Sequence, residues 1–276
     1  MLDFSEAIIP LQQWIDSFMD WVINYRFIFQ AIKIPVNGFL EFVINIFMLP
    51  HPFIMIGLIT ALAYWRGGIK LAIFSGLSFL FIAFLGLWEL SMTSLAMIVC
   101  SVMICTIIGI PLGILAARHS RFEAILRPIL DTMQTIPSFA YLVPVVMLFS
   151  IGNVAGVIAT IIFALPPIIR LTTLGIKHVD KECIEAARAY GASPMQVLLK
   201  VQLPLARPSI FAGLNQTIMM ALSMVVTSAL IGAGGLGEIV LQGLNTLEVG
   251  LASIGGIAIV LIAMVLDRIT QSFHKN

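Results

Sequence analysis

The chain has 276 residues, of which 60% are hydrophobic and only 11% are charged, and its mean hydropathy is +1.06. An average soluble domain carries about 25% charged residues, so this chain cannot cover a water-facing surface. It is expected to be an all-α polytopic membrane protein. The net charge of +1 excludes a nucleic-acid binder that depends on a basic field, and three cysteines exclude a disulfide framework.

The first 48 residues differ from the rest of the chain. Apolar residues recur there at alternating steps of three and four, with Trp14 and Trp21 beside them. This period predicts an amphipathic helix with aromatic side chains at the level of the lipid headgroups. Its polar side is acidic, which disfavours attraction to anionic lipids, and we expect residues 1–48 to form an interfacial scaffold on the outside, lying on the outer leaflet or on the spanning helices. The apolar stripe is Ile8, Leu11, Ile15, Phe18 and Val22.

Long apolar stretches follow, and a helix needs about 20 apolar residues to cross the bilayer core. Residues 49–88 are expected to hold two spans, residues 89–270 the core domain, and residues 271–276 a cytoplasmic tail. Several prolines inside the apolar stretches are compatible with ordinary helix kinks and equally with helices that break along a transport pathway. The predicted spans are 50–65, 69–88, 91–117, 138–151, 154–175, 208–231 and 249–267.

Lysine and arginine gather in the loops on one side of these spans, which the positive-inside rule assigns to the cytoplasm. The opposite side would hold only Arg26 and Lys33. This distribution predicts a cytoplasmic C-terminus and an outside N-terminus. The residues on the cytoplasmic side are Arg66, Lys70, Arg118, Arg121, Arg127, Arg170, Lys177, Lys181, Arg188, Lys200, Arg207, Arg268 and Lys275.

The interiors of the predicted spans are nearly free of ionisable residues. Ion-coupled carriers usually keep such a residue at bilayer depth, so we expect the driving force to come from a partner, although a sodium site of carbonyls and hydroxyls stays open. Nor do the four histidines form a metal pair or a catalytic constellation, which disfavours an intramembrane enzyme. The stretches without Asp, Glu, Lys, Arg or His are 92–117, 138–169, 208–231 and 249–266.

Residues 232–237, GAGGLG, formally match a dinucleotide-binding pattern. That pattern requires a preceding strand within a βαβ unit, whereas here it follows a membrane helix. We therefore expect no nucleotide here, but a tight re-entry of the chain that lets the apolar run 239–244 pack back onto the membrane domain. Cys100 and Cys105 are interpreted as buried structural thiols.

Residues 177–207 form the one long, charged cytoplasmic segment, and the helix signals within it predict a helix–turn–helix. Asp180 can cap the first helix and Gly191 can end it in the left-handed conformation. Ser193 can cap the second helix, with Pro194 at its first position. Pro204 and Pro208 are expected to end the second helix before the next span. These signals alone favour a passive solvated hairpin.

The residues of this hairpin favour a more specific interpretation. The run EAARAYGASPMQVLLKVQLP resembles the EAA loop of ABC-importer permeases, with Val201 in place of the usual isoleucine. The resemblance implies that the loop forms a coupling helix that docks on a cytoplasmic ATPase subunit. The residues that carry it are Glu185, Ala186, Ala187, Gly191, Ala192, Val201, Leu203 and Pro204.

Three further stretches, QTIPSFAYLVP, ALPPIIRLT and IGAGGLG, resemble the glycine betaine/proline branch of the permease family. The resemblance implies the MetI-like type I importer fold with about seven transmembrane helices, two permease copies in membrane lipid and an external binding protein. This chain would bind no cofactor, because ATP and Mg²⁺ would sit on the ATPase. Candidate pathway residues are Gln134, Pro137, Phe139, Tyr141, Pro144 and Phe163.

The substrate class left open comprises glycine betaine, proline, choline and carnitine, with a methionine-like amino acid as an alternative. Quaternary ammonium groups bind well to aromatic faces, but the external binding protein is expected to do most of the selection. An ion-coupled secondary carrier and a non-transporting membrane scaffold are the remaining alternatives.

Overall fold

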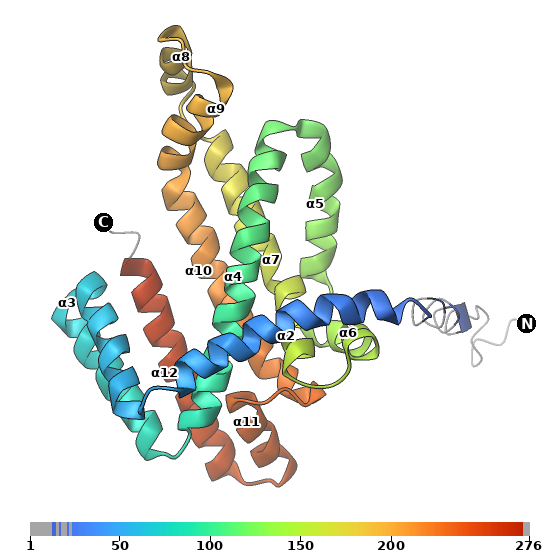
Figure 1. Ribbon diagram of the computed structural model, residues 1–276, viewed down its shortest axis with the longest axis vertical. Helices are drawn as coiled ribbons and strands as arrows, with labels where there is room; N and C mark the ends of the chain where they lie inside the picture. The colour runs from blue at the N-terminus through green and yellow to red at the C-terminus, as the bar shows by residue number, and fades with distance from the viewer. Residues whose placement is uncertain (1–12, 15–16, 18–20, 22–23, 273–276) are drawn as a thin grey trace, which may run out of the picture.

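The computed structural model describes residues 13–14, 17, 21 and 24–272. In this part of the chain every regular element is a helix (Figure 1). The elements are α2 (Arg26–Met48), α3 (Pro52–Phe84), α4 (Trp88–Arg118), α5 (Ser120–Thr135), η1 (Ser138–Tyr141), α6 (Leu142–Phe149), α7 (Asn153–Lys177), α8 (Lys181–Ala189), α9 (Pro194–Val197), η2 (a π-helical turn, Leu198–Gln202), α10 (Leu203–Thr227), η3 (Ser228–Ile231), α11 (Leu236–Asn245) and α12 (Val249–Ser272).

Six helical stretches among the described residues are long and apolar enough to cross a membrane, or seven if a bent pair counts as one span. The spans predicted at 91–117, 154–175 and 249–267 are confirmed as the helices α4, α7 and α12. The all-α polytopic architecture expected from composition is therefore confirmed.

The element α3 is a hairpin of two helices. Gly68 has φ of +76° and ψ of −175°, so the helical path breaks there. The two limbs pack against each other, because a Cβ built on Gly76 would lie 3.0 Å from Thr60 Oγ1. This break separates the two segments predicted at 50–65 and 69–88. Each limb, Pro52 to Gly67 and Ile69 to Phe84, has 16 residues, so it spans roughly 24 Å at about 1.5 Å per residue.

The short span predicted at 138–151 is helical, as η1 and α6, but it qualifies as a membrane span only together with its flank α5. The membrane-length unit begins earlier, with α5, which bends by 106° into the short segment η1–α6. Pro137 favours the bend because the residue before a proline avoids helical geometry, and Ile136 is extended (φ −69°, ψ 130°). Tyr141 Oη donates a 2.6 Å hydrogen bond to the carbonyl of Met133, one of the acceptors that the end of α5 leaves free.

The prediction that Pro204 and Pro208 end the hairpin's second helix is wrong. Helical backbone continues from Pro194 to Ile231 through α9, η2, α10 and η3. Pro204 lies in the first turn of α10, directly after the π-helical turn. The wider ring of this turn accommodates a proline that would clash in a regular α-helix. The span predicted at 208–231 is thus the lower part of a longer helix.

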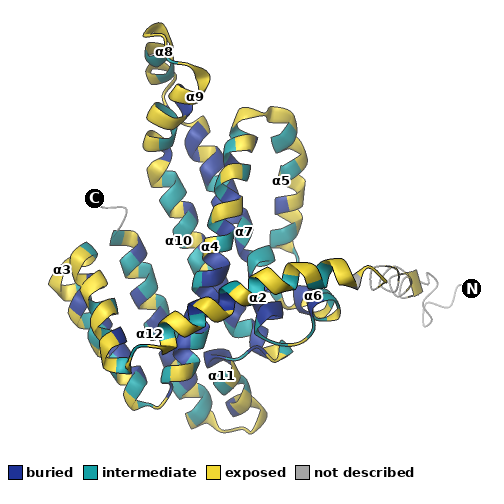
Figure 2. Cartoon of the chain, viewed as in Figure 1, coloured by how far each residue is buried: buried dark blue, intermediate teal, exposed yellow. Residues whose placement is uncertain are grey.

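The N-terminal prediction is only partly open to inspection, since Ile8, Leu11, Ile15, Phe18 and Val22 lie outside the described residues. Residues 27–48, which the sequence analysis placed in the interfacial segment, form a helix of sufficient length and apolarity to cross a membrane. In Figure 1 this helix, α2, lies across α4 instead of alongside it, and Figure 2 shows it largely exposed.

The core lies where α7 packs between α4 and α10. Glycines bring these helices close: a Cβ on Gly113 would lie 2.6 Å from Thr172 Cβ, and one on Gly213 would lie 3.1 Å from Leu171 Cβ. Small residues at helix contacts are how membrane helices approach closely. A second apolar cluster joins α3, α4 and α12. Both thiols of α4 are buried in the first cluster, as predicted for structural cysteines.

Candidate coupling hairpin and pathway residues

The segment between α7 and α10 is a helical hairpin that projects from one end of the molecule, beyond the ends of the other helices (Figure 1). Asp180 caps α8 by accepting a 3.0 Å hydrogen bond from the Glu182 amide. Ser193 and Gln196 form a reciprocal capping box at the start of α9, and Pro194 occupies its first turn. These three local predictions from the sequence are confirmed.

The turn between the two helices depends on Gly191, whose φ is +80°. The Gly191 amide donates to the carbonyl of Arg188 at 2.9 Å, and the Ala192 amide donates to the carbonyl of Ala187 at 3.1 Å. This pair of bonds is the Schellman arrangement, which requires a left-handed residue after the helix. The prediction that Gly191 ends the helix in that conformation is therefore confirmed.

The short helix α8 presents two different faces. Ile184 and Ala187 are half-buried and face the hairpin, whereas Glu185, Ala186 and Ala189 are exposed. The exposed side of α8 therefore consists of the small side chains of Ala186 and Ala189 next to the carboxylate of Glu185. Next to it, Tyr190 is 94% exposed, an unusual position for a large aromatic side chain. Figure 2 shows this end of the molecule as mainly exposed.

The second arm of the hairpin, formed by α9 and η2, is held by buried apolar side chains. Val197 and Leu198 are buried, and beyond them Val201 and Leu203 are half-buried. Pro204 is exposed. Ala192, at the turn, is half-buried. The residues of the predicted coupling motif thus divide into an exposed set on α8 and a set that secures the hairpin to α10.

Two ion pairs between α5 and α7 were missed by the sequence analysis. Asp131 pairs with Arg170 at 2.5 Å, and Glu123 pairs with Lys177. The two helices run antiparallel. The two acids are eight residues apart on α5 and their cationic partners are seven apart on α7, so both ion pairs lie along one line of contact, the α5–α7 seam. The missed signal was this matching spacing, hidden because residues 120–135 had been assigned to a loop.

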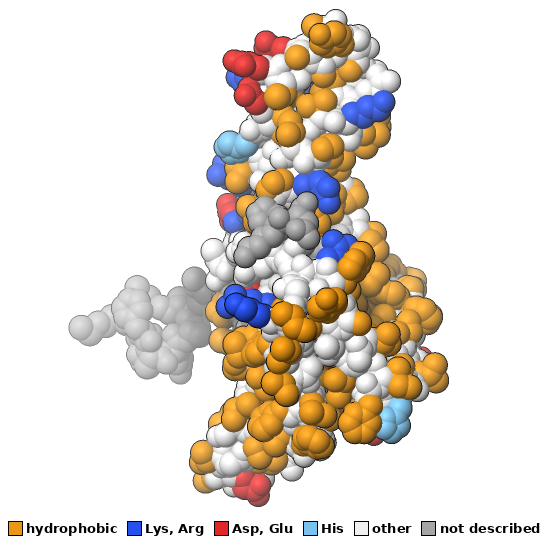
Figure 3. Space-filling model, turned by 90° about the vertical axis from the view of Figure 1, so that its left-hand side faces the viewer, with side chains coloured by type: hydrophobic (Ala, Val, Ile, Leu, Met, Phe, Trp, Pro, Cys, Tyr) orange, Lys and Arg blue, Asp and Glu red, His pale blue; other side chains and the backbone are white. Residues whose placement is uncertain are grey.

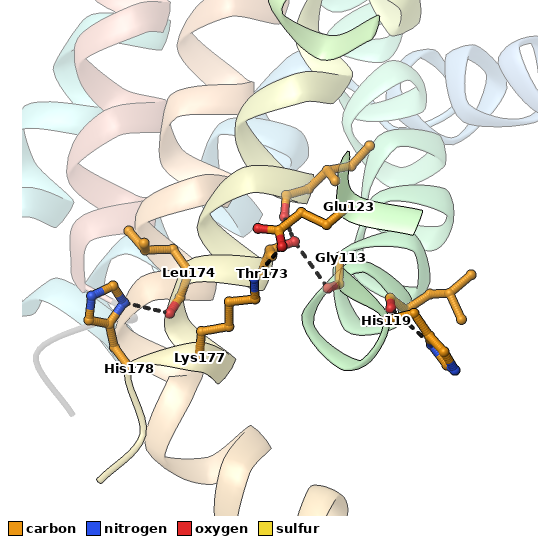
Figure 4. Close-up of polar contacts among 9 residues, drawn as sticks. Gly113, His119, Glu123, Thr173, Leu174, Lys177 and His178 are labelled. Carbon is orange, nitrogen blue, oxygen red and sulfur yellow. Dashed lines mark hydrogen bonds and ion pairs between the residues drawn. The ribbon is translucent and has the colours of Figure 1, made fainter. Parts of the chain in front are cut away.

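Figure 4 shows how this seam continues to α4. Thr173 donates from Oγ1 to the carbonyl of Gly113 at 3.0 Å, tying α7 to α4. The nearby His119 and His178 each contact a carbonyl of their own helix, with Nδ1 at 3.3 Å and 2.9 Å respectively. These histidines therefore complete helix ends, and the described residues hold no group of three or more metal-ligating side chains.

The candidate pathway residues lie around the bend between α5 and α6. Phe139 is 62% exposed, and Gln134 is half-buried with its Nε2 4.0 Å from Met220 Sδ. Tyr141 is buried and its ring centroid lies 6.4 Å from that of Phe163. Tyr141 and Phe163 therefore pack together inside the fold. Of the two pathway prolines, Pro137 is exposed and Pro144 is half-buried.

The glycine-rich stretch at 232–237 makes a tight turn, with φ of +70° at Gly232 and +100° at Gly235. Ser94 Oγ accepts a 2.8 Å hydrogen bond from the amide of Leu236, which begins α11. That helix packs against α12, since a Cβ on Gly255 would lie 2.9 Å from Val240 Cγ2. The predicted return of residues 239–244 onto the membrane domain is confirmed.

Comparison with known proteins identifies the family. The family model described as the binding-protein-dependent transport system inner membrane component matches residues 109–276. The chain belongs to this permease family. The family assignment confirms the resemblance drawn from the EAA loop and makes the chain a multi-pass inner-membrane protein.

The permease is similar over nearly its whole length to transport permeases of other bacteria. It is 49% identical to the glycine betaine/proline betaine transport system permease protein ProW of Escherichia coli (strain K12), covering 99% of this chain and 77% of the relative. It is 45% identical to the glycine betaine transport system permease protein OpuAB of Bacillus subtilis (strain 168), with 96% and 94% covered.

A solved structure of the MetNI methionine ABC transporter in an inward-facing conformation also resembles the permease. The TM-score is 0.60 at 25% identity, covering 66% of this chain and 91% of that one. This likeness confirms the expected MetI-like fold.

Proposed function

We propose that this chain is the permease subunit of an ATP-driven importer for glycine betaine, proline betaine or a closely related quaternary amine. The observation that carries the proposal is the similarity to ProW, which extends over 99% of the chain, including the segments before the shared core. A compatible solute of this kind protects cells against osmotic stress. The permease itself binds no cofactor, and ATP and Mg²⁺ bind to a separate cytoplasmic ATPase.

The coupling role belongs to the hairpin 177–207. The exposed side of α8 combines the small side chains of Ala186 and Ala189 with the carboxylate of Glu185, which suits a helix that enters a groove on another protein. Tyr190 adds an exposed aromatic anchor of the type enriched at binding hot spots. The ATPase binds to this face. The half-buried Val201 and Leu203 attach the hairpin to α10, so a movement of the bound ATPase moves α10.

The membrane orientation follows from charge. The hairpin end carries most of the lysines and arginines and is cytoplasmic, with the N-terminus outside and the C-terminus inside. An external substrate-binding protein delivers the solute to the opposite end. A second copy of the permease completes the pathway, and the interfacial N-terminal segment supports assembly. Exposed apolar side chains on α2, such as Phe27 and Ile34, supply surface for lipid or for this second copy.

The bend after α5 is the best candidate for the solute pathway. Near the bend, the exposed Phe139 and the half-buried Gln134 can contact a solute, whereas Tyr141 and Phe163 pack against each other. An aromatic face at this point would attract a quaternary ammonium group. Choline, carnitine and methionine are the alternative solutes.

Uptake into proteoliposomes tests the proposal. The permease is reconstituted with its ATPase, external glycine betaine binding protein and internal ATP, and ionophores dissipate the proton and sodium gradients. We expect uptake of labelled glycine betaine that requires the binding protein and ATP and survives the ionophores. Uptake that collapses with the gradients while ATP is maintained identifies an ion-coupled carrier. Unlabelled choline, carnitine or methionine that competes better than glycine betaine reassigns the solute.

The coupling assignment has its own variant pair. Glu185→Lys reverses a charge on the proposed docking face, whereas Glu248→Lys reverses one in the exposed α11–α12 connection at the other end. Only Glu185→Lys should weaken copurification of the ATPase, at unchanged permease amounts in the membrane. Equal behaviour of the two variants would remove the coupling role from Glu185.

A further inference from the structure

A cavity of about 340 Å³ lies between the coupling hairpin and the ends of α4 and α7. Small-molecule pockets have volumes of about 300–1,000 Å³, so the cavity can hold a compact ligand. Four cationic side chains line it, and they come from three different helices. They are Arg118 at the end of α4, Lys177 at the end of α7, and Lys181 and Arg188 on α8. Only the fold brings these cations together, because they are spread over residues 118–188.

Three of the four cations have no polar partner in the part of the chain that the structure describes. The side chains of Arg118, Lys181 and Arg188 form no hydrogen bond or ion pair there. Lys177, in contrast, pairs with Glu123 of α5 (Figure 4). None of the described residues that line the cavity is acidic. The cavity therefore gathers positive charge that an anion with several acceptor oxygens can pair with.

The acidic residues closest in sequence do not face the cavity. Glu182 and Glu185 are exposed and do not line it. Glu185 is within four residues of both Lys181 and Arg188, yet it forms an ion pair with neither. Asp180 caps α8 through the Glu182 amide. Figure 3 shows the acidic side chains at this end of the molecule gathered along one edge. Solvent screens exposed acids of this kind, so they leave the cavity positive.

Buried apolar side chains form part of the cavity wall. Ile176, Val179 and Val197 line it and are only 2%, 7% and 3% exposed. Charges beside an apolar wall interact more strongly than charges in open solvent, because the local dielectric constant is lower. Gln202 adds an amide group that can donate a hydrogen bond to an oxygen atom. The wall therefore strengthens the attraction between the cations and a bound polyanion.

We infer that this cavity binds a soluble anion with two or more phosphate groups. A phosphate monoester carries about −1.5 to −2 charges at pH 7, so a single phosphate group does not neutralise three unpaired cations. Guanidinium groups such as those of Arg118 and Arg188 bind phosphate oxygens bidentately. A lipid headgroup shares this chemistry, but the hairpin that forms part of the wall projects beyond the ends of the other helices (Figure 1).

The bound anion bridges the break in helical backbone between α7 and α8, at residues 178–180. It joins Lys181 and Arg188 of α8 to Arg118 of α4. Lys181, Ile184 and Arg188 are three or four residues apart, so they share one face of α8. Ala186 and Ala189 of the proposed docking face lie on another face. The anion thus fixes the position of α8 and leaves the docking face free, and its binding does not depend on the transported solute.

Isothermal titration calorimetry tests the inference without measuring transport. The full permease chain is reconstituted in nanodiscs of phosphatidylcholine, which has no net charge, and is titrated with inorganic pyrophosphate at fixed ionic strength. We expect saturable binding of one pyrophosphate per chain. Its affinity should exceed that of inorganic phosphate at least about tenfold, because the second phosphate group adds charge-assisted hydrogen bonds. Absence of saturable binding, or equal affinity for the two anions, overturns the inference.

Matched variants separate the cavity from the general positive charge of this end. The double variant Arg118→Gln, Arg188→Gln should bind pyrophosphate at least about tenfold more weakly. Arg188→Gln alone is the milder version if the melting temperature shows that the double variant does not fold. The control, Arg121→Gln with Arg207→Gln, removes the same charge from two exposed arginines outside the cavity and should keep the affinity within about twofold. Equal weakening in both double variants, or normal binding in Arg188→Gln, overturns the inference.

Nanodiscs that contain phosphatidylglycerol distinguish the two sources of phosphate. At the same ionic strength, pyrophosphate binding that persists in these discs supports a soluble ligand. Loss of that binding assigns the cavity to a lipid headgroup and overturns the inference of a soluble anion.

Discussion

The turn of the coupling hairpin permits a substitution whose effect comes from backbone conformation alone. Gly191 has φ of +80°, and a Cβ built on it meets no atom within 4 Å. Gly191→Val therefore introduces no clash with a neighbouring side chain. It forces a β-branched residue into the left-handed region, where L-residues other than asparagine and aspartate are disfavoured.

The cost follows from this geometry. A non-glycine residue in the left-handed helical region costs about 1–2 kcal/mol, and a β-branched residue lies at the upper end of that range. At about 1.4 kcal/mol per factor of ten, the hairpin conformation seen here becomes roughly 5- to 30-fold less populated. Asparagine tolerates the same φ, so Gly191→Asn is the matched control that adds a side chain with little strain.

ATPase copurification and solute uptake are measured on the same membranes. Because the hairpin lies beyond the spanning helices, both variants should reach the membrane in near-normal amount. We expect Gly191→Val to lose most ATPase binding and uptake, and Gly191→Asn to keep both within about twofold, since a few tenths of a kcal/mol separate asparagine from glycine there. Normal ATPase binding and uptake in Gly191→Val would show that the hairpin is passive.

Two further predictions concern the packing of α7. Gly113→Val should lower the free energy of unfolding of the purified permease by about 1–3 kcal/mol, because the new Cβ would lie 2.6 Å from Thr172 Cβ. At Gly57 a Cβ meets nothing within 4 Å, so Gly57→Val should lower the free energy of unfolding far less. Equal shifts of the melting temperature in the two variants would refute the packing explanation. Exchanging Asp131 and Arg170 should restore most of what either single reversal loses. The coupling measured by this double-mutant cycle should stay below about 1 kcal/mol and fall with salt, because both side chains are over a third exposed; a salt-independent coupling would contradict it.

The coupling hairpin could be predicted from the sequence because its structure depends on local signals. Asp180, Gly191 and Ser193 each act on a backbone group within a few residues, so their side chains alone specify where helices begin and end. The helices α4, α7 and α12 could also be predicted from the sequence, since uninterrupted apolar length suffices to identify them.

The bend after α5 could not be predicted from hydropathy. The α5 sequence carries Arg121, Glu123, Arg127 and Asp131, which together are typical of a loop. Their placement becomes favourable only in the fold, where both acids find cationic partners on α7. Likewise, the apolar run at 138–151 looks like a span by composition, but Pro137 turns the chain before it can continue the helix. Tertiary pairing and a single proline therefore outweighed the local signal.

The continuity of α10 changes how the hairpin can act. Had Pro204 ended the helix, as the sequence suggested, a flexible joint would separate the coupling helix from the membrane domain. Instead the π-helical turn at 198–202 carries helical backbone past the proline, while α7 runs unbroken to Lys177 on the other arm. The second arm of the hairpin is thus an extension of α10, whereas α8 follows α7 only after a break at residues 178–180. A partner that docks on the hairpin, as proposed, would therefore act on α10 through helical backbone that is continuous from Pro194.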